Sequence, residues 1–210
     1  MTGRRLAYGG IALVVLASLV IQLVLVFTGG ADANSGETGA DVGTRLWRLF
    51  SYFTIESNLF VLVTAVALAL RPRTERPVAR LDALLGITIT GLVFAIVLAP
   101  QLHLTGAALV ATIGFHYVSP VAYVLAWLVL GPRPRIGWHT IVLAFIWPVL
   151  WLFYIFVQGA FTDWYPYPFL DVTDIGLGTA IRNAAAVVLL GIALAALYRW
   201  LARRLPQCSG

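Results

Sequence analysis

The stretch "FSYFTIESNL", residues 50–59, sets six polar side chains inside a run of aliphatic residues that continues to Leu70. The six are two serines, a threonine, a tyrosine, a glutamate and an asparagine. Such groups are costly to place in hydrocarbon unless each has a partner or a function. The stretch therefore predicts a membrane helix whose polar face is turned toward the interior of a helical bundle.

The composition of the whole chain agrees with this interpretation. The 210 residues are 60% hydrophobic and only 11% charged, whereas soluble domains carry about 25% charged residues. The chain is long enough for a single membrane domain, residues 1–210, and for no sizeable soluble one. Its basic residues are fourteen arginines and no lysine, a bias that suggests a GC-rich bacterial genome.

Six apolar spans are expected, each near the roughly 20 residues that a helix needs to cross a bilayer. Their ranges are 6–28, 46–70, 81–102, 106–130, 137–158 and 176–199. The first span is followed by "ADA", as in a secretory signal, but signal cores are shorter, at roughly 7–15 residues. The fold class expected is therefore an all-α, polytopic membrane protein with six transmembrane helices in one bundle.

The arginines predict the orientation of the bundle, since cytoplasmic loops are enriched in basic residues. They cluster before the first span, between the second and third (Arg71, Arg73, Arg76 and Arg80), between the fourth and fifth, and after the last. Both termini are therefore expected in the cytoplasm and the protein in the cell membrane, the inner or plasma membrane. The other side carries acidic residues: Asp32, Glu37, Asp41, Asp163, Asp171 and Asp174. No nucleic-acid partner is expected, since the basic residues mark topology.

Polar side chains recur on single faces of several spans. On a helix with about 100° per residue, Ser51, Ser57 and Asn58 lie within about 60° of Thr54, while Glu56 faces another neighbour. The fourth span places a second polar set on one face: Thr112, His116, Ser119 and Tyr123. Pro120 should kink this span near the histidine. The fifth span has one aromatic and polar face: Trp147, Trp151, Tyr154 and Gln158.

These groups are expected at one depth. At about 1.5 Å per residue from the cytoplasmic helix ends, Thr54 lies at about 24 Å, His116 at about 22 Å and Arg182 at about 26 Å. Glu56 and Tyr154 lie at about 21 and 26 Å. The shared depth favours a functional layer in the outer half of the membrane. The same residues also allow three simpler roles: hydroxyls bonded to their own helix, a structural histidine, and a plain ion pair between Glu56 and Arg182. Their similar depths predict a direct or water-bridged contact between Glu56 and Arg182, with Asp171 or Asp174 as the alternative partner of the arginine.

The layer contains the parts needed for nucleophilic attack on a carbonyl. A threonine hydroxyl needs an adjacent base, and His116 is the residue of the layer whose type has a near-neutral reference pKa. Asn58 could stabilise an oxyanion, and so could Tyr123, Tyr154 or Arg182. Arg182 could instead bind a carboxylate. Ser51 and Ser57 would line the pocket, and the 158–176 loop would fold over its outer mouth.

Three short motifs resemble a known family. "FTIESNL" (53–59), "HYVSP" (116–120) and "WYPYPFL" (164–170) are similar to motifs of the androgen-induced and androgen-dependent TFPI-regulating membrane proteins. The resemblance implies a bacterial relative of six-helix threonine hydrolases that cleave fatty acid esters of hydroxy fatty acids. It also implies Thr54 as the nucleophile and His116 as the required histidine.

The function expected is thus an intramembrane lipid-ester hydrolase that uses Thr54 and His116, takes a membrane lipid or fatty-acid ester as substrate, and needs no cofactor. The alternative is a lipid- or small-anion-binding or transport protein with a non-catalytic polar pocket anchored by Arg182. A haem carrier is disfavoured, because His103 does not match the depth of His116. The single cysteine, Cys208, allows no intramolecular disulfide, and no Cys/His cluster suggests a metal site.

The arginine distribution makes the topology testable. A reporter fused after Gly210 should read as cytoplasmic, and the same reporter inserted in the 158–176 loop should read as extracytoplasmic. The opposite pair of results would overturn the orientation, and the placement of the polar layer in the outer half of the membrane would change with it.

Overall fold

A computed structural model of the chain describes residues 2–29, 40–71 and 76–206. Asp32, Glu37, Arg73 and Cys208 lie outside these ranges, together with the inferences drawn from them. Within the ranges, six helical segments are long and apolar enough to cross a membrane: Thr2–Thr28, Phe53–Leu70, Pro77–Gln101, Gly106–Leu130, Trp138–Thr162 and Leu177–Arg204. The expectation of an all-helical fold with six such helices is confirmed.

Five of the predicted spans correspond to one helical segment each. The first is α1 (Thr2–Thr28), the fifth α7 (Trp138–Thr162) and the sixth α9 (Leu177–Arg204). The third consists of α4 (Pro77–Val93), the π-helical turn η1 (Phe94–Leu98) and the 3₁₀ turn η2 (Ala99–Gln101). The fourth consists of α5 (Gly106–Ile113), the π-helical turn η3 (Gly114–Val118) and α6 (Ser119–Leu130).

The second predicted span, 46–70, is wrong as a continuous helix. It is divided into α2 (Val42–Ser51) and α3 (Phe53–Leu70). Between them Tyr52 is extended, with ψ 125°. Neither proline nor glycine occurs in residues 50–59, so the break has no local cause in the sequence. It depends on side chains from other parts of the bundle, described below.

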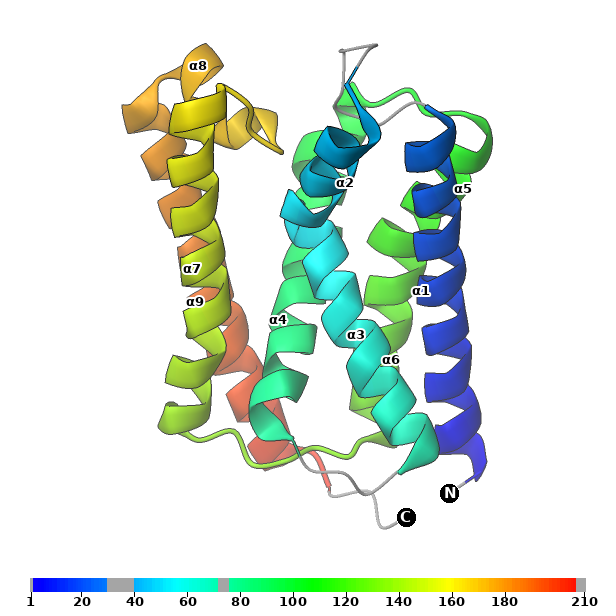
Figure 1. The fold of residues 1–210 in the computed structure, drawn as a ribbon. Helices are drawn as coiled ribbons and strands as arrows, with labels where there is room; N and C mark the ends of the chain where they lie inside the picture. The colour runs from blue at the N-terminus through cyan, green and yellow to red at the C-terminus, as the bar shows by residue number, and fades with distance from the viewer. Residues whose placement is uncertain (1, 30–39, 72–75, 207–210) are drawn as a thin grey trace.

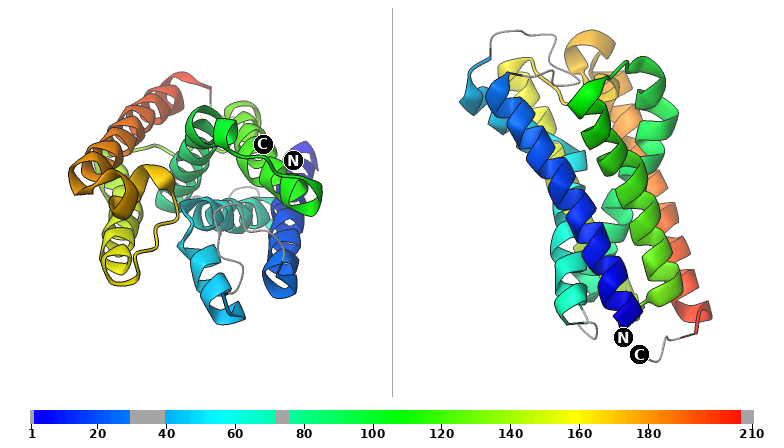
Figure 2. Two further views of the ribbon diagram at one scale, coloured as in Figure 1. Left: turned by 90° about the horizontal axis from the view of Figure 1, so that it is seen from above. Right: turned by 90° about the vertical axis from the view of Figure 1, so that its right-hand side faces the viewer.

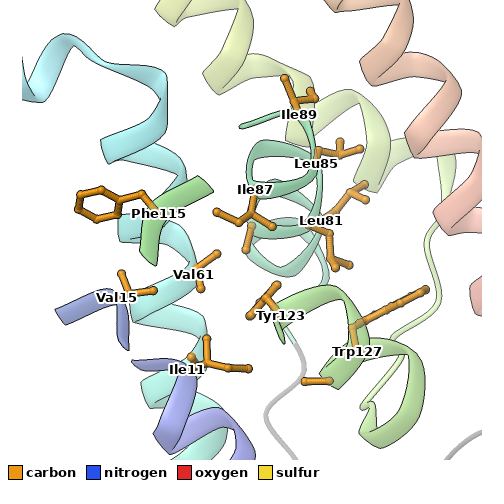
Figure 3. Packing of buried hydrophobic residues seen from close by; sticks show 14 of the residues in the cluster. Ile11, Val15, Val61, Leu81, Leu85, Ile87, Ile89, Phe115, Tyr123 and Trp127 are labelled. Carbon is orange, nitrogen blue, oxygen red and sulfur yellow. The ribbon is translucent and has the colours of Figure 1, made fainter. Parts of the chain in front are cut away.

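Helix α4 occupies the middle of the bundle (Figures 1 and 2). On one side it packs against α3 and α6, where Val61, Ile87 and Tyr123 are fully buried (Figure 3). On its other side stand α7 and α9. Helix α4 crosses close to the start of α6 because Gly91 has no side chain: a Cβ there would lie 3.0 Å from the Cβ of Pro120. The start of α1 and the end of α9 lie at the same end of the bundle.

The segment between α7 and α9 folds back at the opposite end of the bundle. It contains the 3₁₀ turn η4 (Pro168–Leu170) and the short α8 (Val172–Ile175). Tyr165, Tyr167 and Leu170 are buried, and the ring of Tyr165 packs over Gly159, where any side chain would collide with it. The segment thus packs into the bundle as a structural element and brings Tyr167 inside.

Candidate functional site

The break at Tyr52 frees backbone groups that a continuous helix would pair, and side chains from distant segments bond two of them. Ile55 N–H donates to the Tyr52 carbonyl, which leaves the Ser51 carbonyl without its usual helical donor. Trp151 of α7 fills this place, with its Nε1 donating to the Ser51 carbonyl at 3.0 Å. The N–H of Thr54 lies in the first turn of α3 and donates to the hydroxyl of Tyr167 at 3.1 Å. These two groups are therefore satisfied from distant segments.

The structure brings together the two residues predicted as nucleophile and base. Thr54 Oγ1 lies 3.2 Å from Nε2 of His116. The other ring nitrogen, Nδ1, lies 3.0 Å from the Thr112 carbonyl oxygen. A carbonyl can only accept, so Nδ1 carries the proton and Nε2 offers its lone pair. The threonine hydroxyl therefore donates to the histidine, which is the arrangement that general-base catalysis requires.

Two π-helical turns hold the histidine in place. His116 is the central residue of η3, which ends just before Pro120, a residue with no N–H to donate into the helix. The predicted disturbance of this span near the histidine thus takes the form of a π turn, a feature frequent at functional sites. Phe94 begins the second π turn, η1. Its ring stacks on the imidazole at a centroid distance of 3.8 Å, which fixes the plane of the ring.

Tyr167 is a site residue that the sequence analysis missed. Its hydroxyl lies 3.2 Å from Thr54 Oγ1 as well as 3.1 Å from the Thr54 nitrogen. Burial raises the pKa of Tyr167 to about 12, so the phenol stays protonated at physiological pH. It can accept from the Thr54 N–H while donating its own proton to Thr54 Oγ1. The signal available in the sequence is its position between two prolines, 166 and 168, which restrict the backbone around it.

Asn58 links the nucleophile to the base. Its Nδ2 donates to the Thr54 carbonyl at 2.9 Å and lies 3.4 Å from the carbonyl oxygen of Phe115, the neighbour of His116. The amide is therefore engaged by two backbone carbonyls of adjacent elements, α3 and η3. This geometry supports a positioning role in place of the oxyanion role expected from the sequence.

Glu56 and Arg182 do not form the pair that was predicted. Glu56 Oε2 accepts from Nε1 of Trp147 at 2.5 Å, and no ion pair joins it to Arg182 in the described part of the chain. Arg182 is exposed on α9. Its neighbour Asn183 faces inward and donates to the Phe169 carbonyl at 2.9 Å. The sixth span thus contributes an anchor for the segment that carries Tyr167, and the arginine lies apart from the site.

The remaining predicted residues lie around the site without touching the nucleophile. Ser51 Oγ and the Tyr154 hydroxyl are 2.9 Å apart, so these two join α2 to α7 beside the helix break. Ser57 packs against Gly86 of α4. Tyr123 bonds to Thr64 Oγ1 at 2.6 Å; Thr64 is ten residues beyond Thr54 along α3, about 15 Å away. Tyr123 therefore belongs to a different polar cluster.

Two cavities meet at Thr54 and Tyr167. The first, of about 70 Å³, lies between α4, α7 and α9 and extends to Asp82 and Gly191. The second, of about 80 Å³, is lined by residues of α1, α2, α3, α5 and η3, including Thr112 and His116. Both linings are mostly apolar. A group bound at the threonine could thus extend apolar substituents in two directions.

Within residues 2–29, 40–71 and 76–206, no three His, Cys, Asp or Glu side chains gather closely enough to share a metal ion. Comparisons of the chain with protein-family models, with curated proteins and with solved structures found no match. The chemistry of the site is therefore inferred from its own geometry.

The role of Trp151 in stabilising the helix break can be tested by substitution. Trp151→Phe keeps an aromatic ring but leaves the Ser51 carbonyl buried without a donor, which should lower the free energy of unfolding by roughly 1 to 3 kcal/mol. Thermal unfolding in detergent measures the change. Trp200→Phe is the matched control, because Trp200 is 55% exposed and its loss should leave the melting temperature nearly unchanged. Equal melting temperatures for both variants would contradict the role given to Trp151.

Proposed function

We propose that the protein is an intramembrane hydrolase of lipid esters in which Thr54 is the nucleophile and His116 the general base. The observation that carries this proposal is the 3.2 Å contact from Thr54 Oγ1 to His116 Nε2, combined with the contact of Nδ1 to a backbone carbonyl. The pair lines a mostly apolar cavity, where a lipid ester could reach it.

The reaction would proceed in two stages. Thr54 Oγ1 attacks the ester carbonyl while its proton passes to Nε2 of His116. The tetrahedral intermediate collapses, the alcohol leaves with the proton from His116, and the acyl group remains on Thr54. Water then attacks the acyl-threonine with His116 again as base, which releases the fatty acid and restores the hydroxyl.

The first turn of α3 and Tyr167 would stabilise the oxyanion. The Thr54 N–H points out of a helix N-terminus, where the helix dipole favours negative charge. The neutral Tyr167 hydroxyl now occupies the space beside this N–H. A substrate oxygen entering there would take the N–H from the tyrosine, whose own proton would then be free to donate to the oxyanion.

The two apolar cavities favour a substrate with two long apolar arms joined at an ester. Fatty acid esters of hydroxy fatty acids, the substrates implied by the motif resemblance, have this shape. The location that goes with this proposal is the cell membrane, with cytoplasmic termini and with Thr54 in the outer half of the bilayer.

The binding or transport alternative loses its expected anchor, because Arg182 is exposed and lines neither cavity.

Substitution of the pair tests the chemistry. Thr54→Ala and His116→Ala should each reduce ester hydrolysis by about 10⁴-fold or more, and the double variant should be no worse than either single one, since the two groups act as a unit. Thr54→Ser should keep part of the activity because a hydroxyl remains. Activity is measured as the fatty acid released from a panel of lipid esters. A fluorophosphonate probe should label the wild type and the control variant Ser57→Ala but not Thr54→Ala.

Melting temperatures of the same variants give the control for folding. A Thr54→Ala protein that folds normally and hydrolyses every ester as fast as the wild type would falsify the threonine mechanism. A wild type that hydrolyses none of the panel but is stabilised by fatty acids would favour the binding-protein alternative.

The proposed role of Tyr167 as a hydrogen-bond donor predicts an effect on kcat rather than on KM. Tyr167→Phe removes one hydroxyl donor and should lower kcat by about 10²-fold, with a much smaller effect on KM because the ring still closes the cavities. Steady-state kinetics on a soluble chromogenic ester separates the two constants. Tyr165→Phe is the matched control, because Tyr165 lies on the same segment but does not contact Thr54. An unchanged kcat in Tyr167→Phe would exclude the donor role.

A further inference from the structure

Asp82 is a buried acid that the proposed mechanism does not use. It is only 6% exposed, and its Oδ1 has no hydrogen-bond partner in the described part of the chain. Arg80, two residues earlier, does not serve as its counterion. The arginine lies on another side of α4, where it donates to the Tyr8 hydroxyl and the Pro132 carbonyl.

The carboxyl group lines the same cavity as Thr54, at the far end. Four residues spaced by one helical turn run along the cavity face of α4 and the start of η1: Asp82, Gly86, Thr90 and Phe94. Phe94 stacks on His116 and so marks the level of the candidate catalytic pair. Asp82 is twelve residues away, about 18 Å along the helix. One lipid chain spans about 15 Å, half of a hydrocarbon core, so the two ends of this row of lining residues are about one fatty acyl chain apart.

The other polar groups of this cavity have partners or belong to the candidate site. The indole nitrogens of Trp147 and Trp151 are bonded to Glu56 and to the Ser51 carbonyl. Two polar groups of the cavity have no hydrogen-bond partner in the described part of the chain: Oδ1 of Asp82 and the hydroxyl of Thr90. A buried carboxyl without a donor is costly whether it is charged or neutral. A ligand that supplied a donor at this point would remove that cost.

We propose that the cavity between α4, α7 and α9 binds the acyl arm of the substrate and that Asp82 recognises a hydroxyl group at the far end of that arm. The preferred substrates would then be esters of ω-hydroxylated long-chain fatty acids. This inference rests on the proposed hydrolase function and adds the identity of the acyl arm. A hydroxyl group fits better than an ammonium group, because the end of the chain must pass about 18 Å of apolar wall, which a charged group would cross only at great cost.

The decisive experiment compares two esters of one alcohol, the palmitoyl and the ω-hydroxypalmitoyl ester. The wild type should favour the hydroxylated ester by about 10-fold or more in kcat/KM, the equivalent of one buried hydrogen bond. Asp82→Leu should abolish this preference by accelerating cleavage of the plain ester relative to the hydroxylated one. Thr90→Val, which removes the other unpaired polar group of the same cavity, should keep the preference for the hydroxylated ester.

A wild type without the preference, or an Asp82→Leu variant that retains it, would overturn the inference while leaving the hydrolase proposal intact. Folding supplies a second criterion. Replacing an unpaired carboxyl by leucine should not lower the melting temperature, so an Asp82→Leu protein that fails to fold would show a structural partner and count against the inference.

If the protein cleaves no ester, the hydrolase proposal fails, and the binding of free fatty acids then tests whether Asp82 recognises a terminal hydroxyl. ω-Hydroxypalmitic acid should raise the melting temperature of the wild type more than palmitic acid does, and the difference should vanish in Asp82→Leu and shrink in Asp82→Asn. Equal stabilisation by the two acids in the wild type would exclude recognition of a terminal hydroxyl.

Discussion

The site depends on one interrupted helix. Inside an apolar bundle every backbone group must find a partner within the protein, so a break at Tyr52 is tolerated only if the groups it frees are paired. Trp151 supplies the donor for the Ser51 carbonyl and Tyr167 supplies the acceptor for the Thr54 N–H. The consequence is that Thr54 occupies the first turn of a helix, with its hydroxyl beside His116 and its N–H directed away from the helix.

The same contacts tie distant parts of the chain to the nucleophile. Tyr167 reaches Thr54 only because its segment is held at both ends, by the ring of Tyr165 over Gly159 and by Asn183 on the Phe169 carbonyl. The polar layer is therefore a structural unit as well as a candidate catalytic one, and stability and activity should be coupled through it.

The sequence predicts the helices and the candidate catalytic pair because both are encoded locally. Apolar runs define the helices. Helical spacing and a common depth place Thr54 and His116 in one polar layer, and the motif resemblance implies their roles. Counting residues gives the height of a side chain but not the direction in which its helix is turned, which is why the predicted pairing of Arg182 with Glu56 is wrong and the arginine lies exposed. The break at Tyr52 and the burial of Tyr167 beside Thr54 depend on tertiary contacts. Residues 50–59 contain no proline or glycine from which the break could be predicted.

A threonine suits this position better than its polarity alone would suggest. Its β-branch restricts the first side-chain torsion, so the hydroxyl can be aimed at Nε2 with less loss of side-chain entropy than a serine would incur. In a helix interior, a threonine hydroxyl would have the carbonyl one turn earlier as a competing acceptor. In the first turn of α3 the preceding chain is extended at Tyr52, which removes that acceptor from helical register. The helix break thus both places the nucleophile where the two cavities meet and frees its hydroxyl for the histidine.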